Sequence, residues 1–495
     1  MLLCIGIALA APGDPVEDLA WRIARAEGGP VVLGGSERSP YAIASLLDGM
    51  PIDDPTWRLA AGPVRQATDP EDLALSGQTI VALRAWSLAS AGNGVVQHAQ
   101  GDDEPGLLSV RAGAEVVALH PWVEGRLSAE TRVDAFGGPL GVDILATEYF
   151  LGVRHGPLRA GFGAEDRWLG PGRHGSLLLA TDASPFPAGV MTVAGPVPRL
   201  GEARAEVGAG WLQLPREDVN GPGLLWMDLR WAPVRYLEVG ASRLTLFGGE
   251  GRPLPSVGEL LLPLDPHVEG DPELLLPDQD ELAAVDIRLN APFPGGYAAA
   301  WWQYGGDDLV FYGRLPALAG VANLFGGEVA WRQAWLTLEY AALMDDRFRW
   351  YQGHRVYHQG FQQAGHWLGY PNGGDSVTWW ASGGWSTPEW SLRAWGEHTT
   401  RVGVVEVLGD QVLALSAPEV ARRAGLEGAA AHGLGWLRAG GLQRGAAPGG
   451  ELRARGRGLG APRLAEPARG ALDRPGERRA GRVDLRPVEP RTGGR

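Results

Sequence analysis

The sequence predicts an all-β protein built from many antiparallel strands, and two features of the residues carry that prediction. In residues 285–290, Val-Asp-Ile-Arg-Leu-Asn, every second residue is apolar and the others are polar, which is the two-residue period of a strand. The same alternation occurs in residues 390–394 and, more loosely, in residues 334–340. Gly, Pro and Asp separate these segments, as they do in antiparallel strands joined by turns.

The aromatic residues bear on the kind of β structure. Eleven of the 20 tryptophans lie between Trp301 and Trp395, many near the predicted strand ends, where an outer-membrane β-barrel places its interfacial aromatic residues. Glycan-binding sandwiches and propellers are also rich in tryptophan, and alternating strands suit a soluble sandwich as well. The residues alone therefore leave both architectures open.

Residues 1–11 resemble the remnant of a secretory signal peptide. The apolar run from Leu2 to Ala10 ends in the small-residue pattern Ala8-Leu9-Ala10, although no arginine precedes it. No later run reaches the roughly 18 apolar residues that a membrane helix needs. The sequence thus predicts an exported chain.

Residues 15–91 show a helical period instead. Val16, Leu19 and Ile23 recur at a spacing of three to four, and Ser39-Pro40 and Asp69-Pro70 each place a capping side chain before a proline. These signals predict three short helices, followed by a polar linker.

Residues 106–416 form the predicted β region. Hairpin breaks are expected at Ala232-Pro233 and at residues 292–296, where proline and glycine interrupt the apolar runs.

Residues 417–495 differ in composition from the rest of the chain. From Ala421 onward there are 16 arginines against seven acidic residues and a single aromatic, Trp436. A segment with so little to bury is expected to be a disordered basic tail or, alternatively, the product of a frameshift in a GC-rich gene.

Several classes of function are excluded by composition. The net charge is −14 and all 44 basic residues are arginine, so no Walker A lysine and no Schiff-base lysine exist, and a nucleic-acid partner is not expected. The only cysteine is Cys4, which rules out a disulfide framework and a cysteine zinc site. Neither Gly-x-Ser-x-Gly nor His-Glu-x-x-His occurs, so the sequence predicts a protein that is not an enzyme.

Residues 351–380, YQGHRVYHQGFQQAGHWLGYPNGGDSVTWW, stand out as a long loop rich in aromatic and polar side chains. Within it His366, Trp367, Tyr370, Asn372 and Asp375 combine flat apolar faces with hydroxyl-binding groups, the combination that sugar binding requires. The alternative is that the glycines and Pro371 only shape a turn that Asp375 caps.

Four further side chains are candidates for binding a sugar or a metal ion. Arg355 and Arg393 are candidates for contact with an acidic sugar, against the alternative of solvated charges in a barrel lumen. His354 and His358 lie four residues apart, about 13 Å along a strand, which is too far to share one ion. No metal and no cofactor are therefore expected.

Two motifs resemble the Wzi-type capsule assembly proteins of Gram-negative outer membranes. They are GRHGSLLLATDASPFP, residues 172–187, and HWLGYPNGGDS, residues 366–376. The resemblance implies an outer-membrane barrel of about 18 strands preceded by a small N-terminal helical segment. It also implies a lectin that anchors capsular polysaccharide to the cell surface.

The prediction is accordingly an outer-membrane antiparallel β-barrel that binds capsular or surface polysaccharide during capsule assembly. Its site residues are His366, Trp367, Tyr370, Asn372, Asp375 and Arg355, and its partners are the polysaccharide and outer-membrane lipid, with the protein as a monomer. Two alternatives stay open: a porin-like passive channel and a secreted β-rich polysaccharide-degrading enzyme. The departure from the family pattern is the C-terminus, which lacks the final amphipathic strand with a terminal aromatic residue.

Overall fold

The computed structural model describes sixteen stretches of the chain. They are residues 79–92, 108–120, 122–135, 142–212, 216–261, 279–306, 308–312, 315–343, 350–351, 356–363, 365–386, 390–401, 405–408, 411–415, 419–430 and 435–439. The chain divides into two units, residues 1–441 and 442–495, and every described residue belongs to the first.

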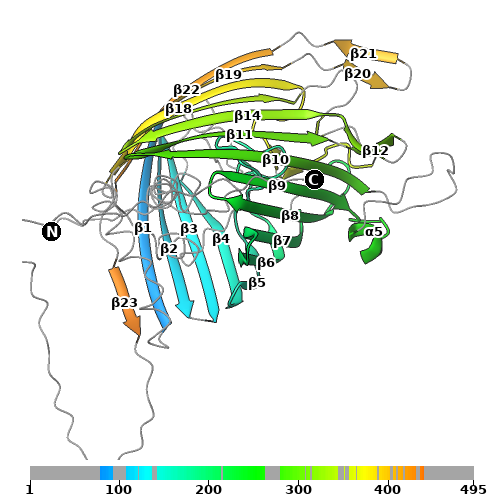
Figure 1. The fold of residues 1–495 in the computed structure, drawn as a ribbon. Helices are drawn as coiled ribbons and strands as arrows, with labels where there is room; N and C mark the ends of the chain where they lie inside the picture. Colours follow the sequence, from blue (N-terminus) through cyan, green and yellow to red (C-terminus); the bar gives the residue numbers. More distant parts are fainter. Residues whose placement is uncertain are drawn as a thin grey trace, which may run out of the picture. The chain divides into compact units, whose positions relative to one another are not determined.

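The described residues form one antiparallel sheet of 17 strands, which confirms the predicted all-β barrel fold. Sixteen strands follow one another in chain order, side by side in Figure 1. They are β1 (Thr79–Gly92), β2 (Leu108–His120), β3 (Val123–Ala135), β4 (Val142–His155), β5 (Leu158–Ala164), β6 (Pro187–Val197), β7 (Gly201–Trp211), β8 (Gly223–Val234), β9 (Leu237–Phe247), β10 (Gln279–Phe293), β11 (Gly296–Gly306), β14 (Ala322–Trp331), β15 (Ala334–Ala342), β18 (Ser376–Ser386), β19 (Trp390–Arg401) and β22 (Glu419–Ala430).

The sheet closes on itself at β1. One edge of β1 pairs with β2, and the other pairs with β22 along Ala89–Gly92 and with β23 (Gly435–Ala439) along Thr79–Leu83. These pairings give both edges of β1 a partner strand along part of its length, and a closed sheet is what a β structure in hydrocarbon requires.

Shorter elements lie between the barrel strands. Three two-stranded hairpins and one short helix are described: β12 (Asp308–Tyr312) with β13 (Leu315–Ala319), β16 (Gln362–Gln363) with β17 (His366–Trp367), β20 (Val405–Leu408) with β21 (Gln411–Leu415), and α5 (Val257–Leu261). None of the described residues forms a helix long and apolar enough to cross a bilayer.

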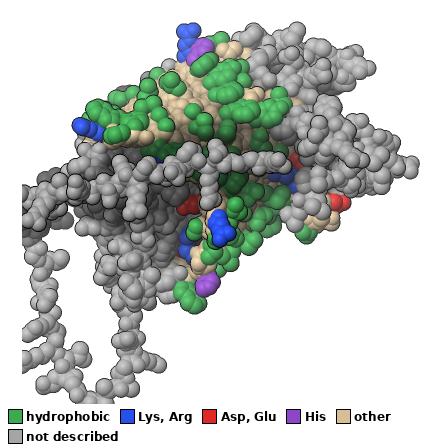
Figure 2. Space-filling view, viewed as in Figure 1, with side chains coloured by type: hydrophobic (Ala, Val, Ile, Leu, Met, Phe, Trp, Pro, Cys, Tyr) green, Lys and Arg blue, Asp and Glu red, His purple; other side chains and the backbone are tan. Residues whose placement is uncertain are grey.

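The strands are polar toward the barrel interior and apolar outside. In β10, Asp286 and Arg288 are buried while Val285, Ile287 and Leu289 are exposed, and β15 buries Thr337 and Glu339 while exposing Leu336 and Leu338. Figure 2 shows hydrophobic side chains spread over the outer surface of the strands. A soluble protein buries such residues, so this inverted pattern is that of a barrel whose outer face meets lipid.

Connections at the two ends of the barrel differ in length. At one end, here called the turn end, two or three residues separate the strands, as at residues 156–157, 198–200, 235–236, 294–295 and 332–333. At the other, here called the loop end, the connections include residues 165–186, 248–278 and 343–375. Bacterial outer-membrane barrels show this asymmetry, with the long connections outside the cell.

Aromatic side chains mark both ends of the outer face, as the tryptophan positions predicted. At the loop end, Tyr304, Trp302, Phe325, Tyr340 and Trp379 form a row across four strands, with successive ring centroids 5.9, 6.1, 6.4 and 4.5 Å apart. At the turn end, Phe293, Trp331 and Trp385 are exposed. Phe325 and Trp331 are six residues apart on β14, so the rows are separated by about 20 Å along the strand.

Three predictions about element boundaries require correction. Residues 79–91, predicted to be helical, lie in β1, where twelve register pairs with β2 override the helix propensity of its alanines and leucines. Strands β22 and β23 lie within residues 417–495, so that part of the predicted tail is ordered. The predicted turn at Ala232-Pro233 lies inside β8, at a register shift between Trp231 and Val234, because a strand accommodates proline at a bulge. Residues 1–78 and 440–495 lie outside the described residues.

Candidate functional site: two segments folded into the barrel

Two of the long connections fold into the barrel interior. The first inner segment, residues 165–186, joins β5 to β6, and the second inner segment, the described residues 350–351, 356–363 and 365–375, lies between β15 and β18. Each carries one of the two motifs noted in the sequence. Side chains of β10, β11, β14, β15, β18 and β19 contact the first inner segment from the inner face of the sheet.

Glu339 of β15 anchors the tip of the first inner segment. Its carboxylate accepts hydrogen bonds from the backbone N–H groups of Arg173 (2.7 Å), His174 (3.4 Å) and Gly175 (3.3 Å). Consecutive N–H groups that converge on one anion form a nest. Gly172 permits this turn, because a Cβ there would lie 2.0 Å from the carbonyl oxygen of Gly175.

Gln303 of β11 fixes the chain on both sides of that tip. Its Oε1 accepts the N–H of Leu177 at 3.0 Å, and its Nε2 donates to the carbonyl of Leu169 at 3.2 Å. Arg288 of β10 donates to the carbonyl of Pro171 at 3.4 Å. Buried backbone groups of the segment are therefore paired with side chains of the barrel wall, as buried polar groups require.

His174 links the first inner segment to β18 and β19. Its ring stacks on Trp380, with centroids 5.1 Å apart and planes at 7°, and its Nε2 lies 2.8 Å from the carboxylate of Glu397. Arg423 of β22 lies 3.3 Å from the same carboxylate. The barrel was predicted to end at residue 416, but β22 lies beyond that boundary and brings the positive charge of Arg423 to the interior.

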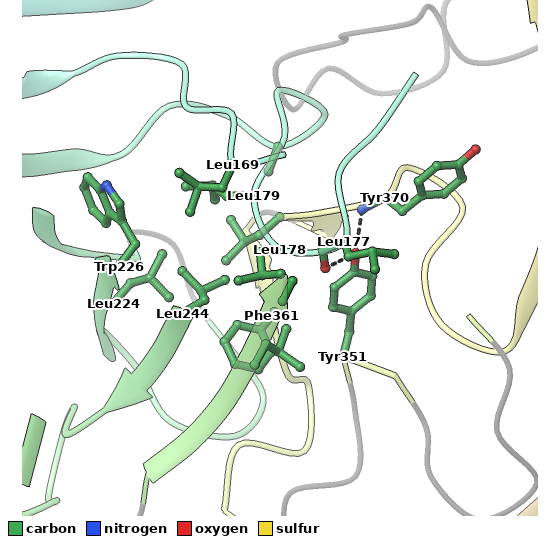
Figure 3. Close-up of a cluster of buried hydrophobic side chains, with 14 of the residues drawn as sticks. Leu169, Leu177, Leu178, Leu179, Leu224, Trp226, Leu244, Tyr351, Phe361 and Tyr370 are labelled. Carbon is green, nitrogen blue, oxygen red and sulfur yellow. Dashed lines mark hydrogen bonds between the residues drawn. The ribbon is translucent and has the colours of Figure 1, made fainter. Parts of the chain in front are cut away.

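The two inner segments bind each other through their backbones and through Tyr351. The N–H of Ala180 donates to the carbonyl of Leu368 at 2.6 Å. The Tyr351 hydroxyl donates to the carbonyl of Leu177 at 2.8 Å and accepts the N–H of Tyr370 at 2.6 Å, as Figure 3 shows. Around them Leu177, Leu178, Leu179 and Phe361 form a buried hydrophobic cluster. Tyr351 adopts a positive φ of 70°, which is rare for a bulky residue. The contacts just described hold its backbone in this conformation.

Two of the predicted site residues, Tyr370 and Asn372, are fully buried. Burial raises the pKa of Tyr370 well above its ordinary value, and the carboxylates of Glu339 and Glu397 add to that rise. The Asn372 amide donates to Thr378 Oγ1 at 3.2 Å, and its oxygen accepts a hydrogen bond from Arg423 at 2.9 Å. The Asn372 side chain thus holds the second inner segment against the barrel wall, whereas the Tyr370 ring contacts His174 of the first inner segment edge-on, with centroids 5.2 Å apart.

His366, Trp367 and Asp375 of the second inner segment are partly exposed. His366 Nδ1 lies 3.7 Å from Oδ2 of Asp182, which belongs to the other motif. Trp367 stacks on Tyr351 with centroids 5.5 Å apart. Asp375 occupies a left-handed turn position with φ of 57° and donates its N–H to the carbonyl of Leu343.

The remaining candidates are placed differently. Arg355 and His354 lie outside the described residues, and His358 is exposed. Arg393 faces the interior, where its guanidinium lies 5.6 Å from the Trp380 ring and donates to Ser382 Oγ at 3.0 Å. Within the described part of the chain, no group of three or more His, Cys, Asp and Glu side chains is arranged to hold a metal ion.

Sequence analysis missed the residues that organise this interior: His174, Asp182, Glu339 and Glu397. Each meets partners more than 150 residues away in the chain, so no local spacing marks it. The clustered glycines in residues 172–175 were the only local signal, because they indicate close approach of backbone to another group.

A clasp at the loop end ties the β7–β8 connection to the second inner segment. Arg216 forms a two-bond pair with Asp218, at 2.8 Å for each bond, and donates to the carbonyls of Gly360 and Gln362. Asp218 also accepts the N–H of Gln359 at 2.9 Å. Partial burial alone would raise the pKa of Asp218, but the hydrogen bonds from Arg216, Val219 and Gln359 outweigh it and lower that pKa below its usual value.

The clasp is expected to depend on pH. Because the pKa of Asp218 is lower in the folded protein, the carboxylate stabilises the clasp above its unfolded pKa of about 3.9, and this stabilisation is lost as pH falls through the folded value. Hydrogen exchange at the Gln359 N–H, corrected for its intrinsic rate, should be protected at pH 6 and lose protection progressively as the pH falls below about 4 toward the lowered pKa of Asp218. In Asp218→Asn the protection should already be low at pH 6. Protection of the wild-type Gln359 N–H that does not fall as the pH is lowered would contradict the assignment.

The fold and the inner segments define a class of protein: a closed outer-membrane-type β-barrel whose interior is occupied by two of its own long connections. The chain belongs to the capsule assembly protein Wzi family, whose model matches residues 141–387. That match includes both motif-bearing segments.

Solved structures agree with the fold. The chain is similar to Wzi of Escherichia coli, described as an outer-membrane protein involved in group 1 capsule assembly and a carbohydrate-binding β-barrel, with a TM-score of 0.57 and 18% identity. The similarity covers 86% of this chain and 98% of that one. Two outer-membrane proteins are weaker matches. OprB of Pseudomonas putida has a TM-score of 0.40 and 11% identity, covering 74% of this chain and 97% of that one. The DcaP channel of Acinetobacter baumannii has a TM-score of 0.40 and 12% identity, covering 72% of this chain and 98% of that one. No curated protein sequence matches the chain.

Proposed function

We propose that this chain lies in the outer membrane and binds capsular or surface polysaccharide, anchoring it to the cell surface during capsule assembly. The observation that carries the proposal is the meeting of the two family motifs at Asp182 and His366, whose side chains lie 3.7 Å apart and belong to two long loop-end connections. Long connections of outer-membrane barrels face the outside of the cell, which is where a surface polysaccharide lies.

The burial of the predicted residues divides their roles. His366, Trp367 and Asp375 are partly exposed and are the groups we assign to polysaccharide contact. Tyr370 and Asn372 are buried, and we assign them to holding the second inner segment in position. Arg355 stays a proposed contact of the same loop. No step in this function breaks a covalent bond, so the protein acts as a binding protein and not as an enzyme.

A binding measurement with two histidine variants tests the proposal. His366→Ala removes a hydrogen-bonding ring beside Asp182 and is expected to weaken binding of purified capsular polysaccharide about 10-fold to 100-fold, the loss expected for a hydrogen bond to a charged group. His358→Ala is the matched control, because His358 is exposed in the same segment and outside the predicted site. Affinities would be measured by surface plasmon resonance on folded protein in detergent. Equal loss in both variants, or no binding by the wild type, would contradict the proposal.

The porin-like alternative predicts a different outcome. An open channel would pass ions in a planar bilayer, whereas the hydrogen bonds described above hold the two inner segments inside the barrel. Steady conductance of the wild type together with no polysaccharide binding would favour the channel.

A further inference from the structure

Three exposed arginines lie at the turn end of the barrel. Arg199 belongs to the β6–β7 turn, Arg235 to the β8–β9 turn and Arg332 to the β14–β15 turn. We call these three residues the arginine rim. Neighbouring turns there are joined by hydrogen bonds, from Trp231 Nε1 to the Leu200 carbonyl at 2.7 Å and from the Arg332 N–H to the Gly295 carbonyl at 2.7 Å.

Two of the three arginines occupy backbone positions that disfavour them. Arg199 has φ of 67° and Arg332 has φ of 53°. Glycine adopts this left-handed conformation without cost, and asparagine and aspartate do so more readily than arginine. The backbone conformation of these turns therefore does not explain why arginine occupies either position. We infer that the guanidinium group at each position has a function of its own.

Aromatic rings set the position of two guanidinium groups. The Arg332 guanidinium lies 4.8 Å from the centroid of the Trp331 ring, and that of Arg235 lies 4.6 Å from the Tyr236 ring. Trp331 and Tyr236 are both exposed, and Trp331 belongs to the outer aromatic row of the turn end. An aromatic ring at a membrane interface sits at the level of the lipid headgroups, so a cation stacked on it lies at the same depth.

Acidic side chains near the rim point away from it. Glu238 is buried and lies 3.9 Å from Arg230 in the interior, and Glu202 is half-buried on an interior-facing position of β7. Among the described residues of these turns, the exposed charge is positive although the whole chain carries −14.

We propose that the arginine rim binds the phosphate groups of anionic phospholipids in the leaflet that faces the turn end. The inference rests on the proposed outer-membrane placement but not on polysaccharide binding. Charge complementarity and the depth set by the aromatic rings select an anionic headgroup over a zwitterionic one. Arginine suits this partner because its planar guanidinium binds a phosphate through two parallel hydrogen bonds.

The test compares lipids at the surface of the reconstituted full-length protein. Spin-labelled phosphatidylglycerol and phosphatidylcholine are added to phosphatidylcholine bilayers, and the motionally restricted fraction of each gives its relative association constant. The wild type should prefer phosphatidylglycerol, by about five-fold per arginine at low salt and less as salt rises. The triple variant Arg199→Gln, Arg235→Gln, Arg332→Gln should bind both lipids equally, whereas the corresponding triple lysine variant should keep most of the preference.

Two more variants separate a lipid role from a structural one. The double variant Arg199→Gly, Arg332→Gly should unfold at the same or a higher urea concentration than the wild type, yet lose the preference that these positions supply. Arg252→Gln is the matched control, an exposed arginine on the loop-end connection, and should leave the preference unchanged.

A wild type without lipid preference, or a triple glutamine variant that keeps it, would overturn the proposal. Polysaccharide binding is measured on the same samples and should be equal in the wild type and the triple variant. Failure of the wild type to bind polysaccharide would count against the proposed function while leaving the lipid result to stand alone.

Discussion

Replacement of Arg230 by methionine is expected to lower the free energy of unfolding by about 3 to 5 kcal/mol. Arg230 is fully buried in the barrel interior, where its Nε donates to Asp228 at 3.0 Å and its Nη1 to Asp286 at 2.6 Å. Removal of the guanidinium leaves two carboxylates close together with no compensating charge from this residue. The measurement is equilibrium unfolding in urea of the protein folded into lipid vesicles.

A second substitution distinguishes the charge from the packing. In the double variant Arg230→Met, Asp228→Asn one buried negative charge is gone, so part of the lost stability should return. A double variant no more stable than Arg230→Met would show that the change in side-chain packing, and not the uncompensated charge, causes the loss in the free energy of unfolding.

Replacement of Glu339 by leucine is expected to cost about 3 kcal/mol or more, because it leaves the N–H groups of Arg173, His174 and Gly175 without their acceptor while keeping the side-chain volume similar. The loss should be concentrated in the first inner segment. Hydrogen exchange of residues 165–186 is expected to speed up far more than exchange in the barrel strands.

Glu250→Leu is the control for that experiment, because Glu250 is an exposed carboxylate in the connection between β9 and β10. It should change stability by less than about 1 kcal/mol. If Glu339→Leu changed the free energy of unfolding as little as this control, Glu339 would not anchor the first inner segment. Polysaccharide binding should also weaken in Glu339→Leu, since the first inner segment carries Asp182 to His366.

The strands were predictable because their pattern is local. Residues 285–290 alternate strictly, and β10 realises that alternation with Asp286 and Arg288 inside and Val285 and Ile287 outside. The alternation does not by itself say which face is dry. The aromatic positions at the strand ends left a barrel and a sandwich both open, the family resemblance implied the barrel, and the exposed apolar faces confirm it.

β1 was missed because its residues favour another structure locally. Alanine and leucine are good helix formers, and only pairing with β2, β22 and β23 makes this segment a strand. β22 was missed for a related reason, since Arg, Gly and Ala give it little strand propensity. Its pairing with β19 over twelve positions supplies the stability that the local sequence lacks.

The sequence predicted which loop carries the candidate site, but not which of its side chains are buried. The motif at residues 366–376 gave the loop and its aromatic residues, yet the burial of Tyr370 and Asn372 follows from contacts with Tyr351, Thr378 and Arg423 that no spacing reveals. The partner of His366 is 184 residues away at Asp182. Long-range pairing of this kind is set by the barrel as a whole.

The most direct test of polysaccharide anchoring is the fraction of capsular polysaccharide that stays on the cell. An encapsulated strain that lacks its own capsule assembly protein of this family would be complemented with the wild type, with His366→Ala and with His358→Ala, each at matched levels in the outer membrane. The account predicts that the wild type and His358→Ala return polysaccharide to the cell surface, whereas His366→Ala releases more into the medium at an unchanged total yield. Equal release with the wild type and with an empty vector would contradict it.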